Sequence, residues 1–236
     1  MSDTPAKTGT DTTTRPSPKG GISLSDAYLL MYNTACAVGW NLTLYKTGNA
    51  LMAGGGVRDA VEATHDIVVA LQLVSTLEFV HACVGLVRSN PVNIFMQVLG
   101  RDLALFSVVT AFPPVRDSAW VLVMFSAWAT SEVIRYPFYA LSIAGMCPPT
   151  LQWLRYTAFI ILYPLGFAGE LGTWIVGLPH IKAVGLPGFP GLPEGSSIYA
   201  LYAYIVLAFA VGAPKLYMHM IGQRKKQLGG VKAKAS

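Results

Sequence analysis

Residues 152–177 read QWLRYTAFIILYPLGFAGELGTWIVG, an apolar stretch that contains only two charged side chains, Arg155 and Glu170. A helix needs about 20 mainly apolar residues to cross a hydrocarbon core of about 30 Å. The stretch is long enough for this, so it predicts a transmembrane helix that carries a carboxyl group inside the membrane.

The rest of the chain has the same character. Of its 236 residues, 53% are hydrophobic and 12% are charged, about half of the roughly 25% charged residues of soluble domains. This composition excludes a disordered protein, a coiled coil and an ordinary water-soluble enzyme. Five further apolar stretches are separated by glycine- and proline-rich turns, and they cover residues 26–45, 67–87, 93–112, 119–144 and 198–221. The expected fold class is all-α, a polytopic membrane bundle of six transmembrane helices.

The boundaries between these stretches are marked by turn-forming residues. A loop with Gly54, Gly55 and Gly56 precedes the second stretch, and Arg88–Pro91 forms a turn before the third. Proline pairs end the third and fourth stretches, and a loop rich in glycine and proline spans residues 178–197. We therefore expect each stretch to be one continuous helix between these boundaries.

Basic residues gather at both ends of the chain, which has a net charge of +5. They are Lys7, Arg15 and Lys19 at one end, and Arg224, Lys225, Lys226, Lys232 and Lys234 at the other. The positive-inside rule places both ends in the cytosol, in agreement with an even number of spans. The predicted organisation is a disordered cytosolic tail (1–22), a membrane domain (23–223) and a basic cytosolic tail (224–236). Without interleaved aromatic residues, the basic tail predicts no nucleic-acid binding but contact with membrane lipid.

Two short patterns address location and metal binding. Lys232 and Lys234 stand fifth and third from the last residue, a dilysine pattern that returns membrane proteins to the endoplasmic reticulum. The expected location is therefore the endoplasmic reticulum membrane. The cysteines are far apart and form no ligand cluster, so we expect neither a disulfide framework nor a metal site.

Seven ionisable side chains lie inside the apolar stretches: Glu78, His81, Arg101, Asp102, Glu132, Arg135 and Glu170. Each charge costs about 2.5–3.5 kcal/mol at mid-bilayer, so such residues pair or face a wet cavity. Glu132 and Arg135 are three residues apart and can pair on one helix face. The same spacing predicts a pair between Glu78 and His81. Arg101 and Asp102 diverge by about 100° and need partners on other helices. These six residues form either a polar network that supports helix packing or a functional site.

Glu170 differs because no basic residue lies within four positions of it. Tyr163 precedes it by seven residues, so both lie on one helix face, about 10.5 Å apart along the axis. Gly166 lies between them and is expected to leave a gap on that face. Pro164 removes a backbone donor and frees the carbonyl of Ile160, which predicts a kink. The alternative is that Tyr163 only packs and Glu170 only bonds a neighbouring helix.

An acid and a base on one helix face suit a β-elimination. A carboxyl group in apolar surroundings favours its neutral form, which makes it a candidate general acid. A phenol opposite it can relay or accept a proton. The chain contains no glycine-rich phosphate loop and no dinucleotide fingerprint in a strand–helix context, so we expect no cofactor.

Specific sequence blocks carry a family resemblance that covers residues 26–221. The blocks are Leu77–His81, Gly85–Ser89, Gln97–Arg101, Trp128–Pro137, Leu154–Tyr156, Tyr163–Gly166 and Glu170. With these blocks the chain resembles the membrane 3-hydroxyacyl-CoA dehydratases of very-long-chain fatty acid elongation, the protein tyrosine phosphatase-like A family. Gly100 departs from the pattern, in which serine is expected, but it lies away from Tyr163 and Glu170.

The resemblance implies a six-span enzyme that converts (3R)-3-hydroxyacyl-CoA to trans-2-enoyl-CoA, the third step of the elongation cycle. It places the catalytic residues at Tyr163 and Glu170. We expect Tyr163 to abstract the C2 proton and Glu170 to assist the leaving hydroxyl. Gly166 is expected to contact substrate, and Arg88 and Arg155 to contact the phosphates of CoA, although both arginines could simply extend to the membrane interface.

The implied partners are the condensing enzyme, the ketoacyl-CoA reductase and the enoyl-CoA reductase of the cycle. Two other functions remain open from the sequence. One is a non-catalytic membrane scaffold with the same fold, and the other is a small transporter built around the intramembrane charges.

Overall fold

The computed structural model describes residues 22–185 and 196–232, with side chains up to Leu228. Every regular element in these ranges is helical, which confirms the all-α class. The elements are α1 (Leu24–Met52), α2 (Val57–Cys83), α3 (Pro91–Ala104), the π-helical η1 (Leu105–Thr110), the 3₁₀-helical η2 (Pro113–Asp117), α4 (Ala119–Ile143), α5 (Pro149–Arg155), α6 (Phe159–Val184), α7 (Ser196–Val206), the π-helical η3 (Leu207–Gly212) and α8 (Ala213–Lys232).

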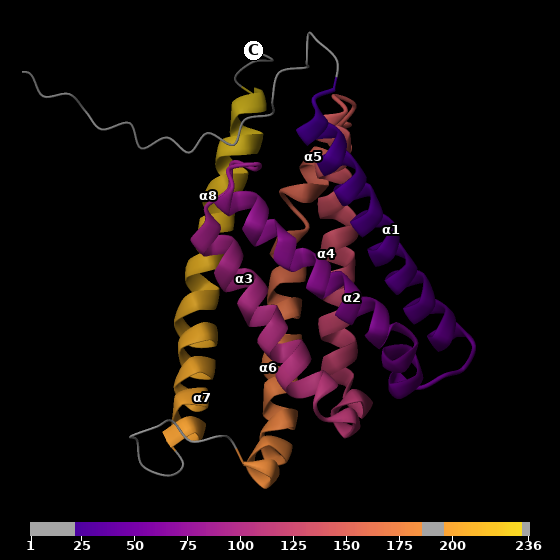
Figure 1. Ribbon diagram of the computed structural model, residues 1–236, viewed down its shortest axis with the longest axis vertical. Coiled ribbons are helices and arrows are strands. Elements are labelled where there is room, and N and C mark those ends of the chain that lie inside the picture. Colours follow the sequence, from indigo (N-terminus) through magenta and orange to yellow (C-terminus); the bar gives the residue numbers. More distant parts are fainter. Residues whose placement is uncertain (1–21, 186–195, 233–236) are drawn as a thin grey trace, which may run out of the picture.

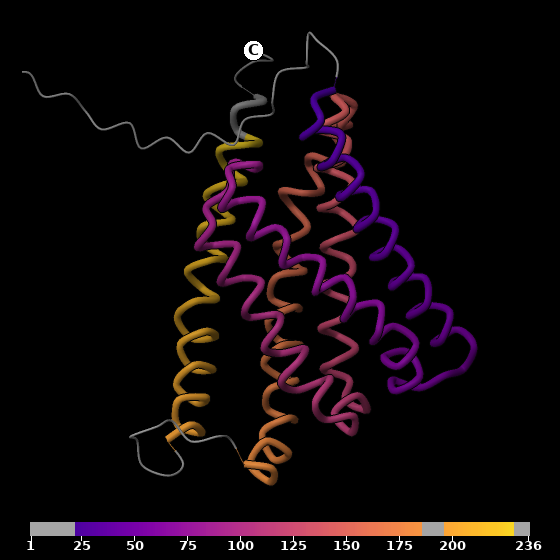
Figure 2. The backbone as a smooth tube through the Cα atoms, viewed as in Figure 1, coloured from indigo at the N-terminus to yellow at the C-terminus, as the bar shows by residue number. Residues whose placement is uncertain are grey.

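The helices run alternately up and down in one bundle (Figure 1). Helix α4 occupies the middle, packed against α1 on one side and α6 on the other, and α2 packs against α1 and α3. Helices α7 and α8 continue one another on the flank beside α6, far from α1 (Figure 2). Helix α1 begins and α8 ends at the same end of the bundle.

Four helical segments of the described residues are long and apolar enough to cross a membrane: Val57–Cys83, Pro91–Thr110, Pro149–Val184 and Ser196–Leu228. The chain is therefore a multi-pass membrane protein. Helix α1 packs against α2 and α4, helix α4 packs against α2 and α6, and neither α1 nor α4 is among the four segments.

Side-chain caps explain where several helices begin. The hydroxyl of Ser23 accepts the backbone N–H of Asp26 at 3.1 Å at the start of α1. At the start of α3, the side chain of Asn90 accepts the N–H of Val92 at 2.9 Å, and Pro91 fills the first helical position. Both arrangements satisfy or remove donors that a helix leaves unpaired. The predicted turn over Arg88–Pro91 is thus confirmed.

The expected loop before the second stretch is wrong in its extent, because α2 begins at Val57 and not near residue 67. The charged residues that suggested a loop are satisfied by tertiary ion pairs at the end of the bundle. Arg58 pairs with Asp117 at 3.0 Å, and Arg116 pairs with Glu62 at 2.9 Å. A helix with these partners remains stable although its first turns are polar.

The stretch 152–177 is not one helix, because α5 ends at Arg155 and α6 begins at Phe159. Contacts from α8 hold the turn between them: Arg224 donates to the Thr157 hydroxyl at 3.4 Å, and the Phe159 and Tyr217 rings are 5.8 Å apart. Such contacts between distant segments are not visible in a local pattern.

Two predicted boundaries near the end of the chain need correction: the end of the stretch 152–177 and the end of the stretch 198–221. Helix α6 continues to Val184, into the expected loop 178–197, of which residues 186–195 lie outside the described residues. Helix α8 continues to Lys232, so residues 224–232 of the expected tail are helical, and basic residues there suit the negative end of a helix dipole. Most of the expected tail 1–22, and Lys234 of the dilysine pattern, lie outside the described residues.

Helices α4 and α6 approach each other closely because α6 presents glycines to α4. A Cβ atom added to Gly169 would lie 2.6 Å from the backbone nitrogen of Met124, closer than real Cβ atoms come. An added Cβ at Gly172 would likewise meet the Trp120 ring. Small residues permit this kind of contact between membrane helices. The close approach brings the neighbouring Glu170 against α4.

Candidate active site

Four charged side chains from three helices form a neutral cluster, which we call the ion tetrad: Glu78 of α2, Arg101 of α3, and Glu132 and Arg135 of α4. Two guanidinium nitrogens of Arg135 donate to Glu78, each at 2.7 Å. Arg101 donates to Glu132 at 2.6 Å, and Arg135 also bonds Glu132. Glu132 is only 1% exposed. Two negative and two positive groups thus balance where water is scarce.

The tetrad confirms two of the expectations for the buried charges. Glu132 and Arg135 pair along one helix, and Arg101 finds its partner on another helix. Glu78 and His81 interact electrostatically, but Glu78 makes its hydrogen bonds to α4 instead of to His81. A forked guanidinium that offers two parallel bonds outcompetes an imidazole on the same helix.

Tyrosines complete the surroundings of this cluster. The hydroxyl of Tyr136 donates to Glu78 at 2.6 Å. His81 meets the hydroxyl of Tyr28 on α1 at 2.8 Å, which explains how it is accommodated without a hydrogen bond to Glu78. Asp102 lies outside the tetrad and interacts with Gln72 of α2, while its buried Oδ1 atom has no hydrogen-bond partner within the described ranges.

Glu170 is held by Trp128, a residue that the sequence did not single out. The indole nitrogen of Trp128, on α4, donates to Glu170 Oε1 at 2.9 Å, and the Trp128 side chain is 2% exposed. The guanidinium of Arg101 lies 5.1 Å from the centre of the Trp128 ring. Glu170 itself is only partly buried. It is therefore oriented by the neutral donor Trp128, and it also interacts electrostatically with Arg101 of the tetrad.

The position of Trp128 could have been recognised from its spacing. It precedes Glu132 by four residues and Arg135 by seven, which places all three on one face of α4. A tryptophan in an apolar stretch is usually a packing residue, so this spacing alone gave no reason to connect it with Glu170.

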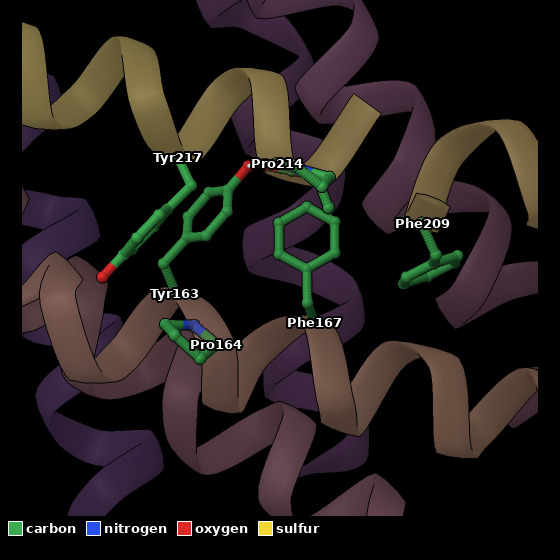
Figure 3. A pocket seen from close by; sticks show the side chains of 7 residues that line it. Tyr163, Pro164, Phe167, Phe209, Pro214 and Tyr217 are labelled. Carbon is green, nitrogen blue, oxygen red and sulfur yellow. Dashed lines mark hydrogen bonds between the residues drawn. The ribbon is translucent and has the colours of Figure 1, made fainter. Parts of the chain in front are cut away.

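Tyr163 lies in an open groove of ≈ 280 Å³ between α6 and the η3–α8 segment. The groove is lined by Tyr163, Pro164, Phe167, Phe209, Ala213, Pro214 and Tyr217 (Figure 3). The Tyr163 hydroxyl donates to the carbonyl of Ala213 at 3.5 Å. In return, the Tyr217 hydroxyl donates to the carbonyl of Ile160 at 3.5 Å. This is the carbonyl that Pro164 leaves without its helical donor.

Tyr163 and Glu170 share one helix face and interact electrostatically, but no direct hydrogen bond between them is seen. A further tyrosine, Tyr204 of α7, also interacts electrostatically with Glu170. Gly166 is buried against α4, and a Cβ added there would lie at an ordinary contact distance of 3.9 Å from the Cβ of Ala127, so the position has room for a small group. Tyr163 thus lines the groove, while Glu170 lies on the same helix with its hydrogen bond to α4.

Arg88 and Arg155 lie away from Tyr163 and Glu170. Arg88 is exposed in the turn between α2 and α3. Arg155 ends α5, with its guanidinium 3.4 Å from the Tyr139 hydroxyl and 5.9 Å from the centre of that ring. Both segments lie at the end of the bundle where α8 ends (Figure 2). No group of three or more metal-ligating side chains occurs within residues 22–185 and 196–232.

Comparison with known proteins gives relatives that match most of the chain. A protein from Homo sapiens named very-long-chain (3R)-3-hydroxyacyl-CoA dehydratase 2 is 33% identical over 209 residues, 87% of this chain and 82% of the relative. The Caenorhabditis elegans very-long-chain (3R)-3-hydroxyacyl-CoA dehydratase hpo-8 is 38% identical over 86% of this chain and 95% of its own. The Arabidopsis thaliana very-long-chain (3R)-3-hydroxyacyl-CoA dehydratase PASTICCINO 2 is 36% identical over 85% and 92%.

No solved structure matches the chain. The family model described as protein tyrosine phosphatase-like protein, PTPLA, matches residues 72–230. This range contains the ion tetrad, Trp128, Tyr163 and Glu170. The chain therefore belongs to the protein tyrosine phosphatase-like PTPLA family.

Proposed function

We propose that the protein dehydrates (3R)-3-hydroxyacyl-CoA to trans-2-enoyl-CoA, the third step of very-long-chain fatty acid elongation. The names of the similar proteins from three organisms support this reaction. The observation that carries it in this chain is the placement of Tyr163 and Glu170 on one face of α6, with Glu170 bonded by Trp128 and not by an arginine. The pair is therefore free to exchange protons with a substrate.

The proposed reaction needs one base and one acid and no other reagent. The base takes a proton from C2 of the acyl chain, and that electron pair forms the C2–C3 double bond. The C3–O bond breaks, and the acid gives its proton to the departing hydroxyl, which leaves as water. Because hydroxide is a poor leaving group, the acid contributes as much as the base.

The hydrogen bonds of the pair support a division of roles opposite to the one expected from the sequence. The Tyr163 hydroxyl is a donor, to the Ala213 carbonyl, and Glu170 is an acceptor, from Trp128. A phenol that carries its proton can act as the acid, and a hydrogen bond donated to a carboxyl group favours its ionised form, which can act as the base. We therefore assign proton abstraction at C2 to Glu170 and protonation of the hydroxyl to Tyr163.

A substrate with a better leaving group tests this assignment. A 3-fluoroacyl-CoA loses fluoride, which needs far less help from an acid than hydroxide does. With this substrate the defect of Tyr163→Phe should shrink, whereas the defect of Glu170→Gln should stay as large as with the hydroxy substrate. The reverse pattern would return the acid role to Glu170.

The proposal includes a six-span domain in the endoplasmic reticulum membrane with both ends in the cytosol. Two observations support it: α1 and α4 pack in the same bundle as the four apolar segments, and α1 begins and α8 ends at one end of that bundle. Accessibility of single cysteines placed in the α1–α2 and α2–α3 connections tests it. The two should be labelled from opposite sides of sealed microsomes.

Arg88 and Arg155 remain proposed contacts of the CoA phosphates, and Gly166 a proposed substrate contact. The condensing enzyme and the two reductases of the cycle remain proposed partners. Co-purification of each enzyme with the tagged full-length protein from solubilised microsomes tests the partners.

The decisive test of the reaction uses the purified full-length protein in lipid nanodiscs with a long-chain (3R)-3-hydroxyacyl-CoA. We expect the 2-enoyl-CoA to form, detected by mass spectrometry as a product lighter by one water. Association with elongation enzymes without turnover would support the scaffold instead. Solute flux through reconstituted protein without turnover would support the transporter.

A further inference from the structure

Helices α6 and α8 are joined by a series of polar contacts that follow one another along both helices. From the second turn of α6 back to the turn that precedes it, Tyr163 meets Ala213, Ile160 meets Tyr217, and Thr157 meets Arg224. The contacts measure 3.5, 3.5 and 3.4 Å. We call this contact line, together with the groove of Figure 3, the α6–α8 seam. It has an aromatic groove on one side of Tyr163 and a cation on the other.

The groove side of the seam is apolar and opens sideways. The rings of Phe167 and Phe209 are 5.6 Å apart, and Phe167 lies 4.5 Å from Tyr163. Pro164 and Pro214 at the groove are exposed on the surface of the bundle. In a multi-pass membrane protein such a surface faces lipid, so a hydrocarbon chain can enter the groove from the side.

The other side of the seam ends in a charge. Arg224 is partly buried and lies against the turn between α5 and α6. It is eleven residues from Ala213, about 16 Å along α8. The pantetheine arm of CoA, which separates a thioester from its phosphates, has a comparable length. Arginine is also the side chain best suited to phosphate, because it offers parallel donors.

We propose that the α6–α8 seam is the binding site for the whole acyl-CoA, an inference that rests on the proposed dehydration. The reacting carbons lie along α6 between Tyr163 and Glu170, the acyl chain lies against Phe167 and Phe209, and Arg224 binds phosphate. Tyr217 lies beside the arm that connects them. The order of apolar groove, proton donor and cation along the seam matches the order of chain, thioester and phosphates along the ligand.

Substrates with and without the phosphates test the cationic end. The measurement is KM for a 3-hydroxyacyl-CoA and for the matching 3-hydroxyacyl-pantetheine, with Arg224→Gln and, as control, Lys225→Gln. Lys225 is exposed on another face of α8. We expect Arg224→Gln to raise KM for the CoA substrate about tenfold, the loss of one charge-assisted hydrogen bond. KM for the pantetheine substrate should not change.

Turnover of the pantetheine substrate also shows that the variant is folded, and Arg224→Lys should restore part of the affinity. An equal rise of KM for both substrates, or the same rise in Lys225→Gln, would overturn the phosphate contact. Failure of the wild-type protein to dehydrate either substrate would instead refute the proposed function.

Chain-length dependence tests the apolar end. Phe209→Ala should lower kcat/KM for long acyl chains more than for short ones, whereas Val211→Ala, at an exposed position of the same segment, should leave the profile unchanged. A wild-type profile in Phe209→Ala would overturn the groove assignment. Labelling of another face of the bundle by a photoreactive acyl-CoA would also overturn it. So would a groove that binds phospholipid when acyl-CoA does not displace that phospholipid.

Discussion

Glu132 and Glu170 lie on neighbouring helices of one bundle, but their surroundings differ. Glu132 is 1% exposed and bonds two arginines within the ion tetrad. Glu170 is partly buried and bonds the indole of Trp128. A carboxylate that is neutralised by arginines can support a fold but cannot readily exchange a proton. The comparison therefore separates the acidic residue that stabilises the bundle from the one that is available for chemistry.

The two residues are nevertheless connected. Arg101 bonds Glu132 at 2.6 Å and lies over the Trp128 ring at 5.1 Å, and the same ring donates to Glu170. The polar network, for which the sequence left both helix packing and function open, thus also contacts the residue that orients Glu170. Packing and catalysis share Trp128 as a common element.

The largest effect is expected at the proposed catalytic pair. Glu170→Gln and Tyr163→Phe should each lower the dehydration rate by roughly 100- to 10,000-fold, the contribution of a positioned acid or base. Tyr156→Phe is the matched control, because Tyr156 lies seven residues before Tyr163 and packs on Phe138. It should keep a rate near that of the wild type. A loss of rate in the control Tyr156→Phe as large as in Glu170→Gln and Tyr163→Phe would contradict the assignment.

A large effect on stability is expected at the tetrad. Glu132→Gln leaves Arg101 and Arg135 with a buried excess charge, which should cost about 3–5 kcal/mol of unfolding free energy. The thermal midpoint in detergent measures it. The double variant Glu132→Gln with Arg101→Gln removes one charge of each sign and should be more stable than Glu132→Gln alone. A single variant as stable as the wild type would show that the tetrad does not hold the bundle together.

An intermediate effect is expected where the two regions meet. Trp128→Phe keeps an aromatic ring under Arg101 but removes the hydrogen bond to Glu170, so kcat should fall about tenfold. KM should change little, since Trp128 does not lie in the α6–α8 seam. Because a merely structural role would lower the thermal midpoint without this selective loss of kcat, both quantities are measured on one preparation.

The smallest effect is expected at the edge of the network. Tyr28→Phe removes the 2.8 Å contact with His81, which should cost about 1 kcal/mol of stability and leave the rate unchanged. Chemical denaturation compares it with the wild type. A loss of activity in Tyr28→Phe would extend the functional region to α1.

The sequence predicted the helical class, the turn at Arg88–Pro91 and the intrahelical pair of Glu132 and Arg135, because each depends on residues close together in the chain. It misplaced the start of α2 and the break between α5 and α6, since the partners that decide them are far away in the chain. Asp117 satisfies Arg58, and Arg224 satisfies Thr157.

The same limit applies to the site. The spacing of Tyr163 and Glu170 was readable, because one helix turns through known angles. The bond from Trp128 was not, since it spans 42 residues and depends on the close approach of α4 and α6 at Gly169. The preference of Glu78 for Arg135 over His81 spans 57 residues and was equally hidden.

The most direct test measures two quantities on the same preparations of Glu170→Gln and Glu132→Gln: the rate of 2-enoyl-CoA formation and the thermal midpoint. Glu170→Gln should lose its rate and keep the midpoint of the wild type. Glu132→Gln should have a lower thermal midpoint than the wild type, while the fraction that remains folded still forms 2-enoyl-CoA at a substantial rate. A Glu170→Gln protein that dehydrates at the wild-type rate would contradict the central claim.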